Sequence, residues 1–231
     1  MQNNNILIIG NKQYYNFNLN NIVDSFDIIY RFNMCFPGNN NGTKFGKLAM
    51  CNHVYDNFVR NSISKEQMIQ KYDQEMEAEF LNNWYDFFQE NKQNFAEIYY
   101  EPVRTGSMNK ILEDYGSPYR FSKMASSGYS VIFRNLVEGN KVYVLGFTLH
   151  DDEIRKTTGE IDEFAKSKNL GGGCHSFSDE RNILAWLHNN KKIDASLCMV
   201  EDTYELSLKN NAHNTEPSEF ILNLLNKEQK R

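Results

Sequence analysis

The sequence predicts an α/β fold, a Rossmann-like open and mostly parallel sheet with helices on both faces. Short apolar runs that end in turn residues recur along the chain, and segments with apolar residues at helical spacing separate them. This alternation continues over most of the 231 residues. Chains that alternate strands and helices in this way build parallel sheets, because each crossover places a helix against a face of the sheet. Ligands of such sheets bind at the carboxyl ends of the strands.

The predicted strands are the apolar runs. The run at 6–9 is closed by Gly10 and Asn11, the pattern of a buried strand that reaches a turn. The run at 141–147 gives the clearest strand of the chain and ends at Gly146 and Phe147. In chain order, the predicted strands are residues 6–9, 27–33, 47–54, 98–103, 141–147 and 193–200.

The predicted helices carry apolar residues three and four positions apart. The segment 65–91 has the longest such pattern and predicts one long helix or two joined helices. The segment 126–137 stops before Gly139, and glycine is a common residue at a helix end. In chain order, the predicted helices are residues 19–26, 65–91, 107–115, 126–137, a polar segment at 160–170, 178–189 and 217–228.

Composition predicts one domain over residues 1–231, with 40% hydrophobic residues to fill a core. The net charge is −5, and Lys and Arg are scattered, so we expect no nucleic-acid partner. The four cysteines lack Cys-x-x-Cys spacing, which indicates free thiols. No run approaches the roughly 18 apolar residues of a membrane span. We therefore expect a cytoplasmic protein, and peripheral contact with the inner membrane stays open.

Several short motifs at the expected strand ends and helix starts follow one another along the chain. They are Ile9-Gly10-Asn11, Asp24, Asp27, Arg31-Phe32-Asn33, residues 42–46, Ser126-Ser127-Gly128, residues 142–147, and His175 with Glu180 five residues later. In this order they resemble the sialyl motifs of the animal-type sialyltransferases. The bacterial lipooligosaccharide sialyltransferases are a second match.

The resemblance implies a sialyltransferase variant of the GT-A-like fold. It also implies an inverting, metal-independent glycosyltransferase that needs no cofactor. The donor would be a CMP-sugar carrying sialic acid, a related nonulosonic acid or Kdo. The acceptor would be the terminal sugar of an oligosaccharide or glycolipid.

Each candidate residue has a chemical reason and a plainer alternative. Ser126, Ser127 and Gly128 open a helix, where backbone amides and the helix dipole favour a phosphate, or else a serine there only caps the helix. Asn11 and Asn33 offer both donors and acceptors to a nucleoside, or else are turn residues. Gly146 and Phe147 end a predicted strand, on the edge where the donor would bind.

His175 is the candidate general base, because imidazole has a pKa near neutrality. Its alternative is a polar surface residue in a loop. Glu180 falls in the first turn of a predicted helix, where it either orients the site or stabilises the helix. We expect no metal ligands.

Two other classes of function stay open. One is a different Rossmann-like enzyme, such as a dehydrogenase or another transferase, although Gly10 is not followed by the G-x-G-x-x-G spacing. The other is a non-catalytic nucleotide- or glycan-binding module. The aromatic third motif of the animal family is not evident between Gly146 and His175, so the hypothesis of a non-catalytic binding module stays open.

Overall fold

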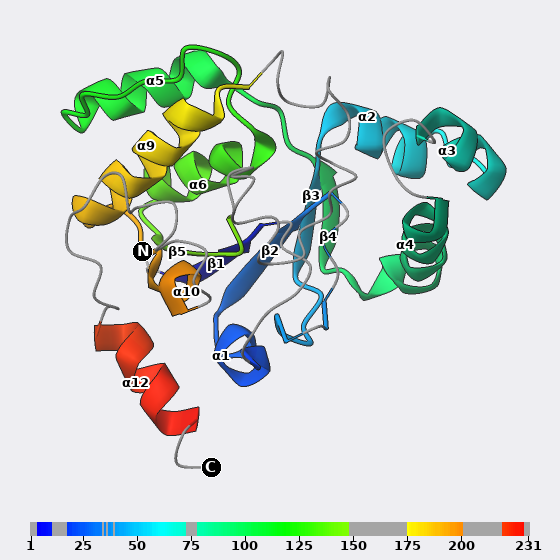
Figure 1. The fold of residues 1–231 in the computed structure, drawn as a ribbon, viewed down its shortest axis with the longest axis horizontal. Helices are drawn as coiled ribbons and strands as arrows, with labels where there is room; N and C mark the ends of the chain where they lie inside the picture. The colour runs from blue at the N-terminus through cyan, green and yellow to red at the C-terminus, as the bar shows by residue number, and fades with distance from the viewer. Residues whose placement is uncertain are drawn as a thin grey trace.

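The protein has a single described sheet of five parallel strands (Figure 1). A computed structural model describes residues 4–10, 18–33, 35, 37–38, 40–72, 78–147, 175–200 and 219–228. The strands are β1 (Asn5–Ile9), β2 (Ile28–Phe32), β3 (Lys47–Met50), β4 (Glu97–Tyr100) and β5 (Lys141–Leu145). The predicted Rossmann-like α/β fold is confirmed.

The helices lie between and after the strands. They are α1 (Asn20–Asp24), α2 (Asn52–Tyr55), the π-helix η1 (Asp56–Arg60), α3 (Lys65–Tyr72), α4 (Ala78–Asn91), the 3-10 helix η2 (Lys92–Asn94), α5 (Thr105–Asp114), α6 (Ser127–Val137), α9 (Phe177–Asn189), α10 (Ser196–Val200) and α12 (Glu219–Glu228). The long apolar pattern at 65–91 therefore corresponds to α3 and α4.

Alternate residues of β1 face opposite layers of helices. Ile6 and Ile8 belong to a cluster that α5, α6 and α9 complete, whereas Leu7 and Ile9 pack with residues of α1, α10 and α12. Figure 1 shows α5, α6 and α9 on one side of the sheet and α1 and α12 on the other. This period of two is the consequence of strand geometry, and it leaves residues 6–9 of β1 buried on both faces.

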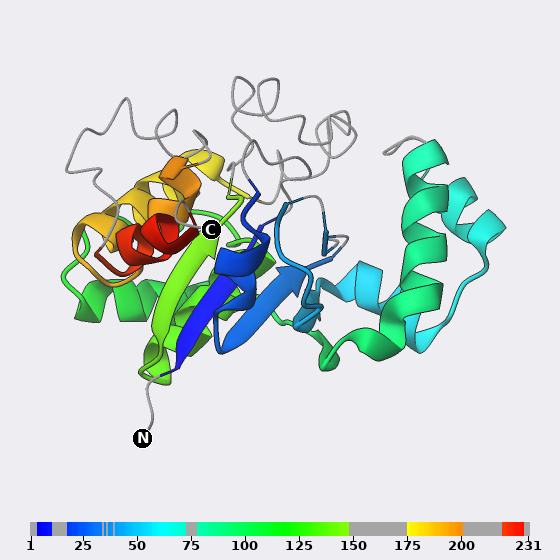
Figure 2. The ribbon, with the colours of Figure 1, turned by 90° about the horizontal axis from the view of Figure 1, so that it is seen from below.

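A third apolar cluster lies at the β3 and β4 side of the sheet. Its centre is Trp84 of α4, whose ring stands 4.6 Å from the ring of Phe58 and packs with Phe88. Figure 2 shows α3 and α4 grouped together, away from α9 and α12. Together with α2 and η1, the α3 and α4 pair thus packs at the β3 and β4 side of the sheet.

The strand order β4-β3-β2-β1-β5 has one reversal, between β1 and β5. The chain builds outward from β1 to β4, returns through α5 and α6, and adds β5 on the other side of β1. The connections on the two sides of β1 therefore leave in opposite directions at the carboxyl ends of the strands. This reversal is the position at which open parallel sheets bind their ligands.

The prediction of a strand over residues 193–200 is wrong. Only Asp194 pairs with the sheet, through the backbone of Val142 and Val144, and α10 begins at Ser196. The Asp194 side chain accepts the backbone N–H of Ser196 at 2.9 Å, which turns the chain into the helix. The periodicity of a short apolar run does not distinguish a strand from a buried helix, and this is why the sequence predicts a strand at 193–200.

The strand predicted over residues 47–54 is shorter than expected, because it ends at Met50 and α2 starts at Asn52.

The polar segment predicted at 160–170 lies outside the described residues, as does Cys174. The described cysteines Cys35, Cys51 and Cys198 form no disulfide, as the sequence predicts. Across the described ranges, none of the helices has the length and apolar character needed to cross a bilayer.

Candidate functional site at the strand reversal

The carboxyl ends of β1 and β5 meet in close backbone contact. The N–H of Gly10 donates to the carbonyl of Leu145 at 2.7 Å. A Cβ atom on Gly10 would lie 2.4 Å from the carbonyl oxygen of Gly146, so only glycine fits there. Gly146 itself has a φ of +69°, the left-handed region that favours glycine. These contacts explain why both predicted strand ends carry glycine.

The first turn of α6 packs against the chain that leaves β5. A Cβ atom on Gly128 would lie 3.1 Å from the ring of Phe147, and the Phe147 side chain is 7% exposed. The ring of Phe147 also stands at right angles to Phe32, with centroids 6.1 Å apart. The ring of Phe147 therefore packs against the first turn of α6 and is buried inside the protein.

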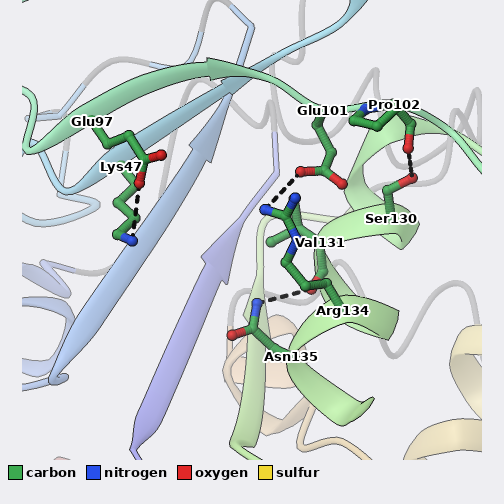
Figure 3. Close-up of polar contacts among 8 residues, drawn as sticks. All are labelled: Lys47, Glu97, Glu101, Pro102, Ser130, Val131, Arg134 and Asn135. Carbon is green, nitrogen blue, oxygen red and sulfur yellow. Dashed lines mark hydrogen bonds and ion pairs between the residues drawn. The ribbon is translucent and has the colours of Figure 1, made fainter. Parts of the chain in front are cut away.

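The opposite side of α6 is anchored to the chain that follows β4 (Figure 3). The guanidinium of Arg134 lies 3.0 Å from the buried carboxylate of Glu101, and the Ser130 hydroxyl donates to the carbonyl of Pro102 at 3.2 Å. Ser130 and Arg134 are one turn apart, so both contacts lie on one face of the helix. These two contacts fix the middle of α6 to the chain that follows β4.

The 121–126 segment, which leads into α6, is held by side chains from two other elements. Thr105 and Asn109 of α5 bind it from one side, and residues at the start of α9 bind it from the other. In chain order, the contacts are the Phe121 N–H and carbonyl with Asn109, the Ser122 N–H with Asp179, the Met124 carbonyl with His175, the Ala125 N–H with Thr105, and the Ser126 N–H with Glu180. The segment is thereby fixed at nearly every residue, although it has no regular secondary structure.

His175 is one of the side chains that hold this segment. Its Nδ1 atom lies 2.6 Å from the carbonyl oxygen of Met124. A carbonyl oxygen only accepts hydrogen bonds, so the contact places the proton on Nδ1. In the neutral ring the lone pair that can take a proton is then on Nε2. The contact therefore sets both the orientation and the tautomer of the imidazole.

Glu180 is buried, with 2% of its surface exposed, although it falls in the first turn of α9 as predicted. Its carboxylate accepts the backbone N–H of Ser126 at 2.7 Å and the Ser126 hydroxyl at 3.2 Å. Burial raises the pKa of Glu180 to about 7. Glu180 thus binds the N-cap residue of α6, a helix far from its own in sequence.

Asp179 binds the same segment next to Glu180. It accepts the N–H of Ser122 at 2.9 Å and also the Ser122 hydroxyl. Although burial raises the pKa of Asp179, the hydrogen bonds from Ser122 outweigh that effect and hold it below its usual range. Neighbouring carboxyl groups of α9 therefore have opposite pKa shifts, and only Glu180 titrates near neutrality.

Asn33 lies at the carboxyl end of β2, with a φ of +42°. Its side-chain oxygen accepts the backbone N–H of Cys51 at 2.8 Å, which ties the end of β2 to the turn after β3. Asn33 therefore has the turn role that the sequence left open, and its amide group stands at the same edge as Gly10. Asn11, the other predicted nucleoside contact, lies outside the described residues.

The structure brings most of the predicted site residues together at one edge of the sheet. Ser126 is the N-cap residue of α6, and Ser127 and Gly128 are its first two residues. Phe147, which follows Gly146, packs against Gly128. Glu180 of α9 binds Ser126, and His175, two residues before α9, binds Met124. Asn33 stands at the neighbouring strand end. The sequence reasoning missed the residues that hold the 121–126 segment, and no local motif marks them. They are Thr105, Asn109, Ser122, Met124 and Asp179.

Within the described ranges, no three His, Cys, Asp or Glu side chains are grouped as metal ligands would be. Comparison of the sequence with protein-family models and with curated proteins finds no match.

Proposed function

We propose that this protein is an inverting glycosyltransferase that uses a CMP-sugar donor and no metal ion. The transferred sugar would be sialic acid, a related nonulosonic acid or Kdo, and the acceptor a terminal sugar of an oligosaccharide or glycolipid. The observation that carries the proposal is the contact of His175 with Met124, just before the start of α6 and beside the strand reversal. A base and an anion-binding helix start lie close together there.

The helix start supplies a place for the donor phosphate. The first N–H groups of a helix have no partner within the helix, and the helix dipole adds positive potential. Ser127 and Gly128 are the first two residues of α6, so their backbone N–H groups are the candidate donors to the phosphate. Asn33 is the described candidate for contact with the nucleoside, through its amide nitrogen.

In the proposed reaction, an acceptor hydroxyl attacks the anomeric carbon of the donor from the side opposite CMP. The bond from oxygen to the anomeric carbon forms as the bond to the phosphate oxygen of CMP breaks. The hydroxyl proton moves to Nε2 of His175, and CMP leaves with the bonding electrons. A positioned base of this kind contributes about 10² to 10⁴ in rate. No covalent intermediate with the protein is involved.

Thermal melting of the protein with separate nucleotides tests the donor class. CMP at about 100 times its Kd would stabilise the fold by about 2.7 kcal/mol. We expect a higher Tm with CMP and no change with UDP, NAD or S-adenosylmethionine. A shift with NAD or S-adenosylmethionine and none with CMP would contradict the proposal and favour a different Rossmann-like enzyme.

Release of CMP from a donor separates an enzyme from a binding module. CMP-sialic acid and CMP-Kdo are incubated with the protein, and free CMP is measured over time. We expect slow release with water as acceptor. Binding of CMP without release from either donor, in the presence of a panel of sugar acceptors, would indicate a non-catalytic module.

A further inference from the structure

The hydrogen bonds between Glu180 and Ser126 have a direction that depends on one proton. An ionised carboxylate only accepts hydrogen bonds, so the Ser126 N–H donates to Oε1 and the Ser126 hydroxyl donates to Oε2. In this state the hydroxyl hydrogen of Ser126 is directed at Glu180. It is then not available to a ligand at the start of α6.

Protonation of Glu180 reverses one of these bonds. A neutral carboxyl group carries one O–H donor and keeps an acceptor oxygen. Oε1 still accepts the Ser126 N–H, while the proton on Oε2 donates to the Ser126 oxygen. The hydroxyl hydrogen of Ser126 is then released and can donate to an anionic oxygen. The only bond formed is the O–H bond of Glu180, and its proton comes from solvent.

We propose that binding of an anionic ligand at the start of α6 is coupled to uptake of one proton by Glu180, which turns the Ser126 hydroxyl from Glu180 toward the ligand. This inference rests on the proposed function and adds a property to it. Glu180 is then a positioning residue that acts through Ser126.

The surroundings of Glu180 favour such coupling. The carboxyl group is buried, and burial with the nearby charge of Asp179 raises its pKa to about 7. An anion added at the neighbouring helix start disfavours the ionised form further. Three other titratable groups lie on the segments that pack around Glu180. The Tyr129 hydroxyl of α6 donates to the backbone carbonyl of Glu180, and His175 binds the Met124 carbonyl. The positive charge of Lys123 lowers the pKa of Asp179.

Calorimetric titration of CMP measures the coupling directly. Titrations near pH 8 in buffers with different ionisation enthalpies report the protons taken up per CMP bound. At this pH the phosphate of CMP is fully ionised, since its second pKa is about 6. We expect the wild type to take up between about half a proton and one proton. Its Kd should rise up to about tenfold per pH unit above pH 8.

Glu180→Gln is the matched variant. The glutamine oxygen accepts the Ser126 N–H and its NH₂ group donates to the Ser126 oxygen, so the variant permanently resembles the protonated state. We expect it to bind CMP at least as tightly as the wild type near pH 8, with no proton uptake and a Kd independent of pH. Uptake in the variant equal to that of the wild type would overturn the proposal.

Ser126→Ala separates the reversal of the hydrogen bond from a simple effect of charge. Without the hydroxyl, no donor is released to the ligand, so we expect weaker binding and a smaller proton uptake than in the wild type. Full uptake in Ser126→Ala would overturn the role of Ser126. Thermal melting of each variant confirms that it is folded. If the wild type does not bind CMP at any pH, the proposed function is overturned as well. If the wild type and Glu180→Gln bind CMP with the same dependence of Kd on pH, only the coupling is overturned.

Discussion

The Nδ1 atom of His175 lies 2.6 Å from the carbonyl oxygen of Met124, 51 residues earlier in the chain. This contact orients the imidazole at the start of α6 and directs the basic nitrogen away from Met124. Because Met124 belongs to the 121–126 segment, which α5 and α9 both hold, the histidine is attached to a rigid part of the fold. Such rigidity is what a catalytic group needs to keep its geometry.

The buried carboxyl group of Glu180 should make stability depend on pH. Its pKa is about 7 in the fold and close to 4.5 when exposed, so the folded state holds more protons between these values. The contribution of Glu180 to the free energy of unfolding therefore falls as pH rises from about 4.5 to about 7, by about 3 kcal/mol in total. We expect the Tm difference between the wild type and Glu180→Gln to change across this window and to be constant above it. A difference that is independent of pH would contradict this account.

The tight packing of Gly128 can be tested against a glycine at the equivalent place in another helix. Gly128 and Gly106 are the second residues of α6 and α5, but only Gly128 has a neighbour, Phe147, within reach of a Cβ atom. Gly106→Ala should stabilise the protein by about 0.5 to 1 kcal/mol. Gly128→Ala gains the same helix preference, but the packed ring must move at a cost of about 1 to 3 kcal/mol, so we expect a net destabilisation of up to about 2 kcal/mol. Urea unfolding measures both, and equal effects would contradict the packing argument.

Two substitutions of Asn33 separate its structural role from a ligand role. Asn33→Ala removes the acceptor for the Cys51 N–H and should cost about 1 to 2 kcal/mol. Asn33→Asp keeps that acceptor and tolerates the positive φ, so its stability should stay within about 0.5 kcal/mol of the wild type. It lacks the amide donor, and we expect it to lose the Tm shift with CMP. An unchanged shift would assign Asn33 to the turn alone.

The ion pair between Arg134 and Glu101 anchors α6, and its loss should depend on pH. Burial raises the pKa of Glu101, and Arg134 opposes that effect. Arg134→Met leaves a buried carboxylate without this partner. Because Arg134 is 41% exposed, we expect a cost of about 1 to 3 kcal/mol near pH 8. The cost should shrink near pH 5, where Glu101 takes up a proton more readily.

The variant with both Glu101→Gln and Arg134→Met is the control for this pair. It lacks the cation and its contact with the Tyr99 ring, but it contains no buried charge at position 101. We expect it to be more stable near pH 8 than Arg134→Met alone. If the double variant is no more stable than Arg134→Met, the buried Glu101 carboxylate does not need Arg134 as its partner.

The sequence predicts the elements with strong periodicity and misses contacts between distant segments. The runs at 6–9 and 141–147 become β1 and β5, and the apolar stripe after Ser126 becomes α6, because burial on a sheet requires these patterns. The run at 193–200 is too short for its pattern to separate strand from helix. The partners of the 121–126 segment lie up to 57 residues away, and no local pattern encodes such contacts.

Release of CMP from CMP-sialic acid by His175→Asn tests the central claim most directly. The asparagine amide can donate to the Met124 carbonyl in place of Nδ1, so the variant keeps the contact that holds the segment but has no basic nitrogen. We predict an unchanged Tm shift with CMP and a rate of CMP release lower by about 10² to 10⁴. Release at the wild-type rate would contradict the assignment of His175 as the base.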